Sequence, residues 1–269
     1  APYGGAFRIT RDLSEHFPSR VYSTPISEAA ITGVSCGLSL GGFRPILEIM
    51  FGDFITLCLD QLINHIAKFP YVYEGVFCPV VIRVPMGGGL GYGPTHSQTL
   101  DKLFLGIDGV QVIALNCMIS PRTVYEKILN KKEKTPTIII ENKTDYNVRN
   151  FEVPEKYNGM MRMEEGYPVI RISPESLEPD VTIVTYGGVS KKVLECLYPL
   201  FKEFEICAEV LIFTKINPMT YEDILQSVSK THYLFVVEEG SMMCGWGSEI
   251  VSTVCENVNK HIVAKRISS

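Results

Sequence analysis

Residues 79–98 read PVVIRVPMGGGLGYGPTHSQ, a continuous apolar run that passes directly into a glycine-rich loop. A run without polar alternation is typical of a strand in a parallel sheet that is covered on both faces. Comparable runs recur along the chain at 44–50, 109–114, 137–141, 181–186, 207–213 and 233–238. We therefore predict parallel strands at all of these positions.

Segments with helical spacing separate the apolar runs. They lie at 27–40, 53–69, 120–129, 190–204, 221–229 and 247–258. The alternation of strands and helices predicts right-handed βαβ units in an α/β fold with two doubly wound parallel sheets. Residues 147–167 break the alternation with polar residues, proline and glycine. We expect a linker there, between a first domain at 1–146 and a second at 168–269.

Composition narrows the class of protein. The 25 basic and 30 acidic residues form no long run of one sign, which argues against nucleic acid or an anionic membrane as a partner. No apolar run reaches the roughly 18 to 20 residues that span a bilayer, and the first residues lack the blocks of a signal peptide. The 8 cysteines are scattered without a CxxC pair. This pattern favours free thiols in a reducing compartment over a zinc site or disulfides.

The glycine-rich loop at 85–93 leads to His96. Its glycines do not match the spacing of a dinucleotide-binding fingerprint, and no GK[ST] follows to make it a P-loop. The loop is either a mobile surface segment or a ligand contact. Ligands of open α/β sheets bind beyond the carboxyl ends of strands, so His96 is the histidine best placed for chemistry, although lone histidines are more often structural. A metal site is not expected there, because no second ligand stands at a suitable spacing.

Glu28 stands at the start of the helical segment 27–40. In one interpretation Ser27 is the N-cap and Glu28 an acid that complements the helix dipole. The following turns, AAITGVSCGLSLGG, carry no charge, which is typical of a helix packed on every side. The carboxyl would then be buried, and buried carboxyls tend to stay protonated and donate hydrogen bonds. Phe54, on the next helical segment, is either a core residue or a platform for a ligand ring.

Five short segments follow one another along the chain and are informative as a set. They are YGGAFRIT, TPISEAAI, EIMFGDFI, GYGPTHSQ and, late in the chain, GWGSEI. Together they resemble the beta subunits of pyruvate, branched-chain 2-oxo acid and acetoin dehydrogenases, which are thiamine-diphosphate enzymes of the transketolase-like superfamily. The resemblance covers nearly the whole chain. It implies a transketolase-like pyrimidine-binding domain followed by a transketolase C-terminal-like domain. The family extends further at both ends, so we expect this chain to be either a trimmed form or a divergent relative.

The resemblance also implies roles for particular residues. The family's glutamate at the Glu28 position hydrogen-bonds N1′ of the aminopyrimidine and so promotes removal of the thiazolium C2 proton. Ile26, Met50 and Phe54 fall where the family lines the cofactor pocket. His96 matches the histidine that handles reaction intermediates and acyl transfer to lipoamide.

An absent motif points to a partner chain. Thiamine enzymes hold the diphosphate through magnesium with a GDG motif and a later Asn, whereas here Gly-Asp occurs only at Gly52-Asp53. In the family this half of the site lies on an alpha subunit or in an upstream part of a fused polypeptide. The resemblance therefore implies a heterotetramer with an alpha subunit that carries the magnesium site, a second beta chain, and a lipoyl acyltransferase. The turn at 130–136 lacks the family's usual Asp and Asn ligands, so potassium stays open.

The leading hypothesis is oxidative decarboxylation of a small 2-oxo acid with acyl transfer to lipoamide, performed together with an alpha subunit. Two alternatives remain: a split transketolase-like or acyloin-forming carboligase, and a non-catalytic docking subunit. The expected location is the cytoplasm of a bacterium, or the mitochondrial matrix or plastid of a eukaryote. In this family both subunits contact the substrate side chain, so this chain alone does not identify the 2-oxo acid.

Overall fold

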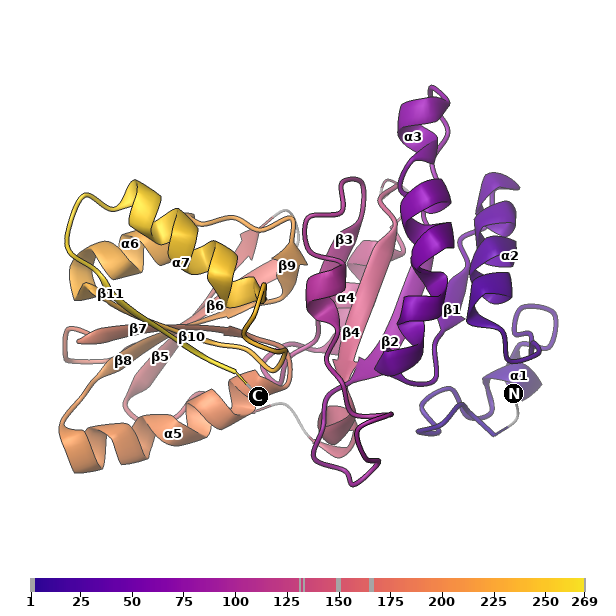
Figure 1. The fold of residues 1–269 in the computed structure, drawn as a ribbon. Helices are drawn as coiled ribbons and strands as arrows, with labels where there is room; N and C mark the ends of the chain where they lie inside the picture. The colour runs from indigo at the N-terminus through magenta and orange to yellow at the C-terminus, as the bar shows by residue number, and fades with distance from the viewer. Residues whose placement is uncertain (1–2, 131, 133, 149–150, 165–166, 269) are drawn as a thin grey trace.

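The computed structural model describes residues 3–130, 132, 134–148, 151–164 and 167–268. Two β-sheets lie side by side, each flanked by helices (Figure 1). The first sheet has five strands in the order β1-β2-β4-β3-β9, and the second has six in the order β11-β10-β7-β8-β6-β5. The strands of the first sheet are β1 (Ile46–Glu48), β2 (Val81–Met86), β3 (Gln111–Ala114), β4 (Thr137–Asn142) and β9 (Lys215–Asn217). Those of the second are β5 (Tyr157–Glu164), β6 (Tyr167–Pro174), β7 (Val181–Tyr186), β8 (Ala208–Phe213), β10 (Tyr233–Val237) and β11 (Val263–Ile267).

Both faces of the first sheet are buried. Ile82 of β2 and Ile138 of β4 belong to a core shared with the irregular helices that follow β1, whereas Val81 and Ile139 pack with α4 on the opposite face. Burial on both faces explains why these strands are apolar without interruption. The helical elements of this half are α1 (Leu13–His16), α2 (Glu28–Leu40), η1 (Gly52–Cys58), η2 (Gln61–Ile66), α3 (Phe69–Val72), η3 (Asp101–Leu103), α4 (Pro121–Ile128) and η4 (Lys143–Asn147).

The second sheet is covered in the same way. Figure 1 shows α6 (Glu222–Thr231) and α7 (Trp246–Asn257) on one face and α5 (Val189–Phe204) on the other. Leu211 of β8 lies in the core on the side of α6 and α7, and its neighbour Ile212 lies in the core on the side of α5. The core that includes Leu211 continues into the first sheet, so the two halves share one hydrophobic interior.

The apolar runs predict β1, β2, β3, β4, β7, β8 and β10 correctly, whereas β5, β6, β9 and β11 lie outside them. Each predicted run contains a strand that pairs in parallel with another: β1 with β2, β2 and β3 with β4, and β7 with β8 and β10. The sheets are mixed rather than purely parallel, because β9 pairs antiparallel with β3, and β6 pairs antiparallel with both β5 and β8. The link between β5 and β6 is too short for a crossover, so these two strands can pair only as a hairpin.

The segment predicted as a linker, 147–167, contains strand β5. Residues 149–150 and 165–166 of that segment lie outside the described residues. Strand β9, from within 168–269, completes the sheet of the N-terminal half. The division into domains at 1–146 and 168–269 stays a prediction.

The helix predicted at 53–69 is not a regular α-helix. The segment begins as the 3-10 helix η1 and continues as the π-helix η2. The chain passes so close to β2 at this point that a Cβ on Gly52 would lie 2.5 Å from the Met86 Cγ. The 3-10 helix, which is wound more tightly than an α-helix, begins at this close contact. Its continuation as a π-helix is of interest because π turns within helices are often found at functional sites.

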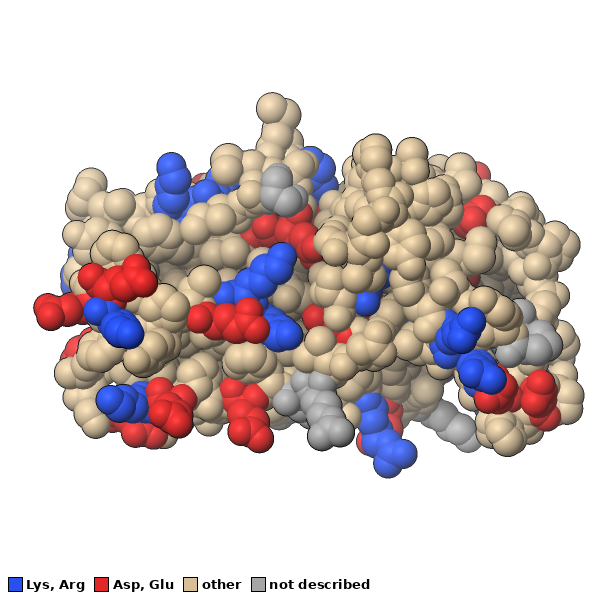
Figure 2. All heavy atoms as spheres, turned by 90° about the horizontal axis from the view of Figure 1, so that it is seen from below, with Lys and Arg blue, Asp and Glu red and all other residues tan. Residues whose placement is uncertain are grey.

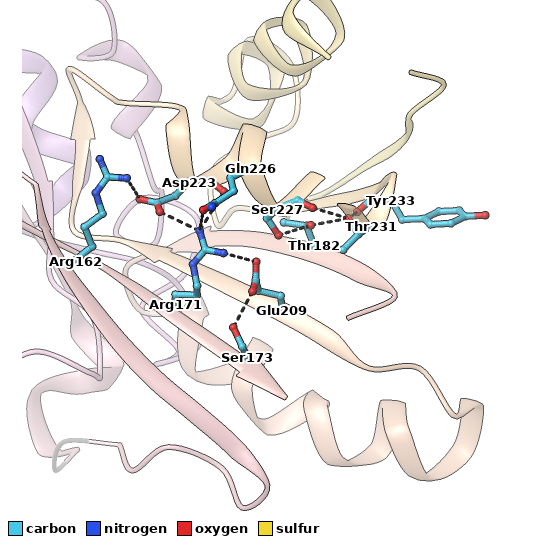
Figure 3. A network of polar contacts seen from close by, with 10 residues as sticks. All are labelled: Arg162, Arg171, Ser173, Thr182, Glu209, Asp223, Gln226, Ser227, Thr231 and Tyr233. Carbon is cyan, nitrogen blue, oxygen red and sulfur yellow. Dashed lines mark hydrogen bonds and ion pairs between the residues drawn. The ribbon is translucent and has the colours of Figure 1, made fainter. Parts of the chain in front are cut away.

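An ion-pair network joins the β5–β6 hairpin to α6 (Figure 3). The Arg171 guanidinium lies 2.8 Å from Glu209 of β8 and 3.0 Å from Asp223 of α6. Arg162 of β5 makes a second contact with Asp223, at 3.0 Å. Shared carboxylates of this kind fix the position of the hairpin on the sheet.

A buried carboxyl, Asp101, lies at the junction of the two halves. It is 1% exposed, and the hydroxyl of Tyr186, on β7 in the second half, donates a hydrogen bond to it. Burial raises the pKa of Asp101 above its ordinary 3.8, against opposing hydrogen bonds from Tyr186 and the backbone.

Asp101→Asn should make the stability of the chain less sensitive to pH. A raised pKa in the folded state contributes stability that is complete below the unfolded value of 3.8 and is lost as pH rises through the folded value. Asparagine does not titrate and still accepts from Tyr186. The unfolding free energy of the variant relative to wild type should therefore increase with pH, in urea titrations from about pH 4 to about pH 8. A difference that is the same at every pH would contradict this account.

Basic and acidic side chains are interspersed in small groups on the face shown in Figure 2. All eight cysteines are free thiols, five of them buried and three exposed, at Cys196, Cys244 and Cys255. In the described part of the chain, no helix combines the length and the apolar character needed to cross a membrane.

Candidate active site

Three chain segments converge where neighbouring strands of the first sheet end. The strand order places the carboxyl ends of β1, β2 and β4 side by side. Met50 and η1 follow β1, the glycine-rich loop follows β2, and Lys143 follows β4 directly. Carboxyl ends of parallel strands are where ligands bind in open α/β sheets. Of the candidate residues from the sequence, Met50, Phe54 and His96 lie on these segments, and Glu28 begins α2, which contacts η1.

The glycine-rich loop has a backbone that other residues rarely adopt. Gly87, Gly89, Gly91 and Gly93 all have positive φ, between 73° and 94°. Alternate glycines are required here, because side chains strain this conformation. The loop is held at its base by Glu239, whose carboxylate accepts a hydrogen bond of 3.3 Å from the backbone N–H of Gly88. Burial raises the pKa of Glu239 above its ordinary value, against the opposing hydrogen bond from Gly88.

The loop places His96 against two aromatic rings. The imidazole lies edge to face with Phe51 at 4.7 Å and with Phe54 at 5.3 Å between ring centroids. Its Nδ1 shares a hydrogen bond of 2.8 Å with the hydroxyl of Thr95. Both His96 and Phe54 are partly buried. The structure therefore brings together two residues that the sequence singled out separately.

Glu28 lies at the first turn of α2, packed on η1. Its residue is 9% exposed. Its backbone carbonyl accepts hydrogen bonds from the Thr32 hydroxyl at 2.7 Å and from the Cys58 thiol, at the end of η1, at 3.7 Å. Ser27 holds the N-cap position without a side-chain cap hydrogen bond. The burial of Glu28 agrees with the interpretation in which its side chain is buried. Helix η1, which contacts Glu28 through Cys58, also carries Phe54.

Helix α2 is not packed on every side, contrary to the expectation from its uncharged sequence. It buries mainly small or polar side chains, among them Thr32, Ser35 and Ser39. Its apolar side chains face outward instead: Val34 is 62% exposed and Leu38 41%. None of the described residues covers that face, so its apolar side chains are suited to contact with another chain.

The remaining predicted pocket residues differ in burial. Met50 is half-buried at the end of β1, whereas Ile26, just before α2, is 80% exposed. The structure therefore does not enclose Ile26 in a pocket of this chain. A buried carboxyl, a partly exposed aromatic ring and an open apolar margin together suit a heteroaromatic ligand, whose ring nitrogen can meet the carboxyl and whose face can meet the aromatic side chain.

Comparison with known proteins decides the family. Residues 2–149 match the pyrimidine-binding domain of transketolase, and residues 171–268 match the transketolase C-terminal domain. The chain is 34% identical to the beta subunit of acetoin:2,6-dichlorophenolindophenol oxidoreductase of Cupriavidus necator, over 94% of this chain and 72% of that protein. This chain belongs to the E1 beta-subunit family of the transketolase superfamily.

Other members of the family show a similar extent of match. The pyruvate dehydrogenase E1 component subunit beta of Porphyra purpurea is 31% identical over 95% of this chain and 75% of its own length. The mitochondrial counterpart of Saccharomyces cerevisiae is also 31% identical, over 96% of this chain and 69% of its own. A solved structure described as a split gene transketolase, inactive beta4 tetramer, shares the fold, with a TM-score of 0.72 at 24% identity, over 97% of this chain and 79% of that one.

The geometry adds residues to the candidate site that the sequence did not single out. They are Phe51 beside His96, Lys143 beneath the loop, and Gln98, whose side-chain amide donates to Asp53 at 2.7 Å. Lys143 could have been found from its place directly after an apolar strand, since polar residues there gather at one edge of the sheet. Phe51 and Gln98 lie in the segments EIMFGDFI and GYGPTHSQ, which carry the family resemblance but assign these two residues no role.

The candidate site was also considered for metal-ligating side chains. Among the residues that the structure describes, no group of three or more His, Cys, Asp or Glu could hold a metal ion. The turn at 130–136, considered for potassium, includes residues 131 and 133, which lie outside the described residues.

Proposed function

We propose that this chain is the beta component of a thiamine-diphosphate-dependent 2-oxo acid dehydrogenase and supplies half of an active site that an alpha chain completes. One observation carries the proposal: a buried acid, Glu28, begins a helix whose apolar face is exposed, at the strand ends that gather Phe54 and His96. Such a half-site suits a family whose relatives are named as beta subunits, of an acetoin oxidoreductase and of the pyruvate dehydrogenase E1 component.

The residues of this chain would take distinct parts. Glu28 would hydrogen-bond a ring nitrogen of the aminopyrimidine, and Phe54, Met50 and Ile26 would contact that ring and its surroundings. When bound, thiamine diphosphate supplies the electron sink for decarboxylation. His96 would move a proton at the reacting oxygen of the substrate and assist acyl transfer to a lipoyl group.

The partners follow from this division of the site. An alpha chain would hold the diphosphate through magnesium, a second beta chain would complete a heterotetramer, and a lipoyl acyltransferase would accept the acyl group. Potassium is not assigned to a site. The compartment would be the cytoplasm of a bacterium, or the mitochondrial matrix or plastid of a eukaryote.

The acceptor assay tests the proposed reaction. The chain is combined with an alpha chain that carries the GDG and Asn motif, with thiamine diphosphate and magnesium, and is given 2-oxo acids. We expect acylation of a lipoyl domain. Carbon–carbon bond formation with aldehydes or sugar phosphates, without acylation of the lipoyl domain, would show a carboligase instead.

Charge on the exposed face of α2 should disrupt assembly. Val34→Asp is expected to weaken association with the alpha chain by at least about 10-fold, because a buried carboxylate would replace an apolar contact. Association is measured by titration in the analytical ultracentrifuge. Tyr198→Asp, at an exposed position on α5 that is 68% accessible, is the matched control and should leave association unchanged. Equal effects of both variants would contradict the assignment of this face.

A further inference from the structure

Lys143 is a buried cation beside the candidate site. It directly follows β4 and is 3% exposed. Burial lowers its pKa below the ordinary 10.5, and the nearby charges of Asp53 and Glu239 act in the opposite direction. Removing an ammonium group from water is costly, so a lysine in this position calls for a specific use.

Lys143 contacts the loop that carries His96 and an aromatic ring that packs against that loop. Its Nζ donates a hydrogen bond of 2.5 Å to the backbone carbonyl of His96. The same ammonium lies 5.5 Å from the ring centroid of Phe51 and 5.9 Å from that of Tyr92. These two rings lie edge to face at 5.5 Å, and Phe51 is also the ring nearest to the imidazole.

Besides these aromatic contacts, three hydrogen bonds between described residues attach the loop to other segments. Glu239 accepts from the N–H of Gly88 at the start, Lys143 donates to the carbonyl of His96, and Asp53 accepts from the side chain of Gln98 just beyond. Between the first two lies the part with alternate glycines, which has little preference for one conformation. Of these three hydrogen bonds, the one from Lys143 is the one made to His96 itself.

We propose that Lys143 is the positioning residue of the His96 loop, and that its ammonium fixes the His96 carbonyl and the Phe51–Tyr92 aromatic pair so that the imidazole stays against Phe54. This role requires a long cationic side chain, because one ammonium group donates to the His96 carbonyl and also lies near the rings of Phe51 and Tyr92. The consequence for catalysis rests on the proposed role of His96, whereas the effect on the loop does not.

Hydrogen exchange on Lys143→Met tests the proposal in the free chain and in the assembled enzyme. Losing a hydrogen bond from a charged donor should open the loop more often, so we expect amides of residues 88–98 to exchange about 10- to 100-fold faster. Lys143→Arg keeps a cationic donor and should restore most of the protection. Lys260→Met is the control, since Lys260 also donates to a backbone carbonyl, that of Ser229 at 3.4 Å.

The pattern of exchange separates a positioning role from a merely structural one. Lys143→Met leaves the nearby carboxylates of Asp53 and Glu239 without this cation, so some loss of unfolding free energy is expected; a positioning role predicts that exchange quickens far more at residues 88–98 than in the strands of either sheet. In the assembled enzyme kcat should fall with little change in KM, and Lys143→Arg should recover it. Unchanged exchange of residues 88–98 in Lys143→Met would overturn the proposal. Faster exchange with unchanged kcat would support the loop role and count against the proposed catalytic role of His96.

Discussion

Glu28→Gln is expected to lower the turnover of the assembled enzyme by roughly 100- to 10,000-fold, the range for loss of a general acid–base group. The change preserves the size of the side chain at the start of α2 and removes the acidic proton. Glu28 is 9% exposed, and its backbone contacts with Thr32 and Cys58 do not depend on the carboxyl. The fold should therefore persist, and steady-state decarboxylation assays should show the loss in kcat rather than in protein yield.

The control for Glu28 is another acid at a helix start. Glu222 lies in the first turn of α6 and is exposed. Glu222→Gln should leave turnover unchanged, because it removes only a dipole interaction worth about 0.3 to 1 kcal/mol. If Glu28→Gln also left turnover unchanged, Glu28 would be a helix-start acid with no part in catalysis. That result would favour the alternative in which the chain is a non-catalytic docking subunit.

Arg83→Met should destabilise the fold by about 3 to 5 kcal/mol, which is the usual cost of removing one partner of a buried ion pair. The Arg83 guanidinium, on β2, lies 2.5 Å from Glu141 of β4 and 2.8 Å from Glu48 of β1. Burial alone would lower the pKa of Arg83, but these carboxylates outweigh it and raise that pKa above its ordinary value. Losing the arginine leaves Glu141 buried, where only the hydroxyls of Tyr125 and Tyr146 still donate to it.

The pH dependence gives the Arg83 prediction a second check. Arg83 outweighs burial and holds the pKa of Glu141 below its ordinary 4.5, so the pair stabilises the fold above that value and ceases to do so as pH falls through the folded value. The difference between Arg83→Met and wild type in urea unfolding should therefore shrink in acid. Lys191→Met, which breaks the exposed pair of Lys191 and Glu195 at 3.8 Å, should cost under about 1 kcal/mol. A similar cost for both variants would contradict the account of the buried pair.

Much of the fold is predictable because burial on both faces leaves a direct trace in the sequence. Each of the central strands is a continuous apolar run, and each run contains a strand in the structure. The antiparallel strand β9 has only three residues, Lys215–Asn217, too short to form such a pattern. Strand β5 reads YNGMMRME and includes exposed methionines, so it has the composition of a loop.

The part of the candidate site that could be predicted consists of residues whose own side chains suggest a chemical role. Glu28, Phe54 and His96 could be named from the sequence, and the structure brings Phe54 and His96 into contact. The support around them depends on side chains that meet across strand ends, such as Lys143 under the carbonyl of His96. No spacing rule links residues 47 positions apart. Likewise, the exposed face of α2 could not be foreseen, because the sequence of an uncharged helix does not say which chain covers it.

The most direct test of the central claim is release of carbon dioxide from a 2-oxo acid by this chain alone, by the alpha chain alone, and by the two together, each with thiamine diphosphate and magnesium. The account of a divided active site predicts turnover only when both chains are present. Turnover by this chain alone at the rate of the pair would contradict it.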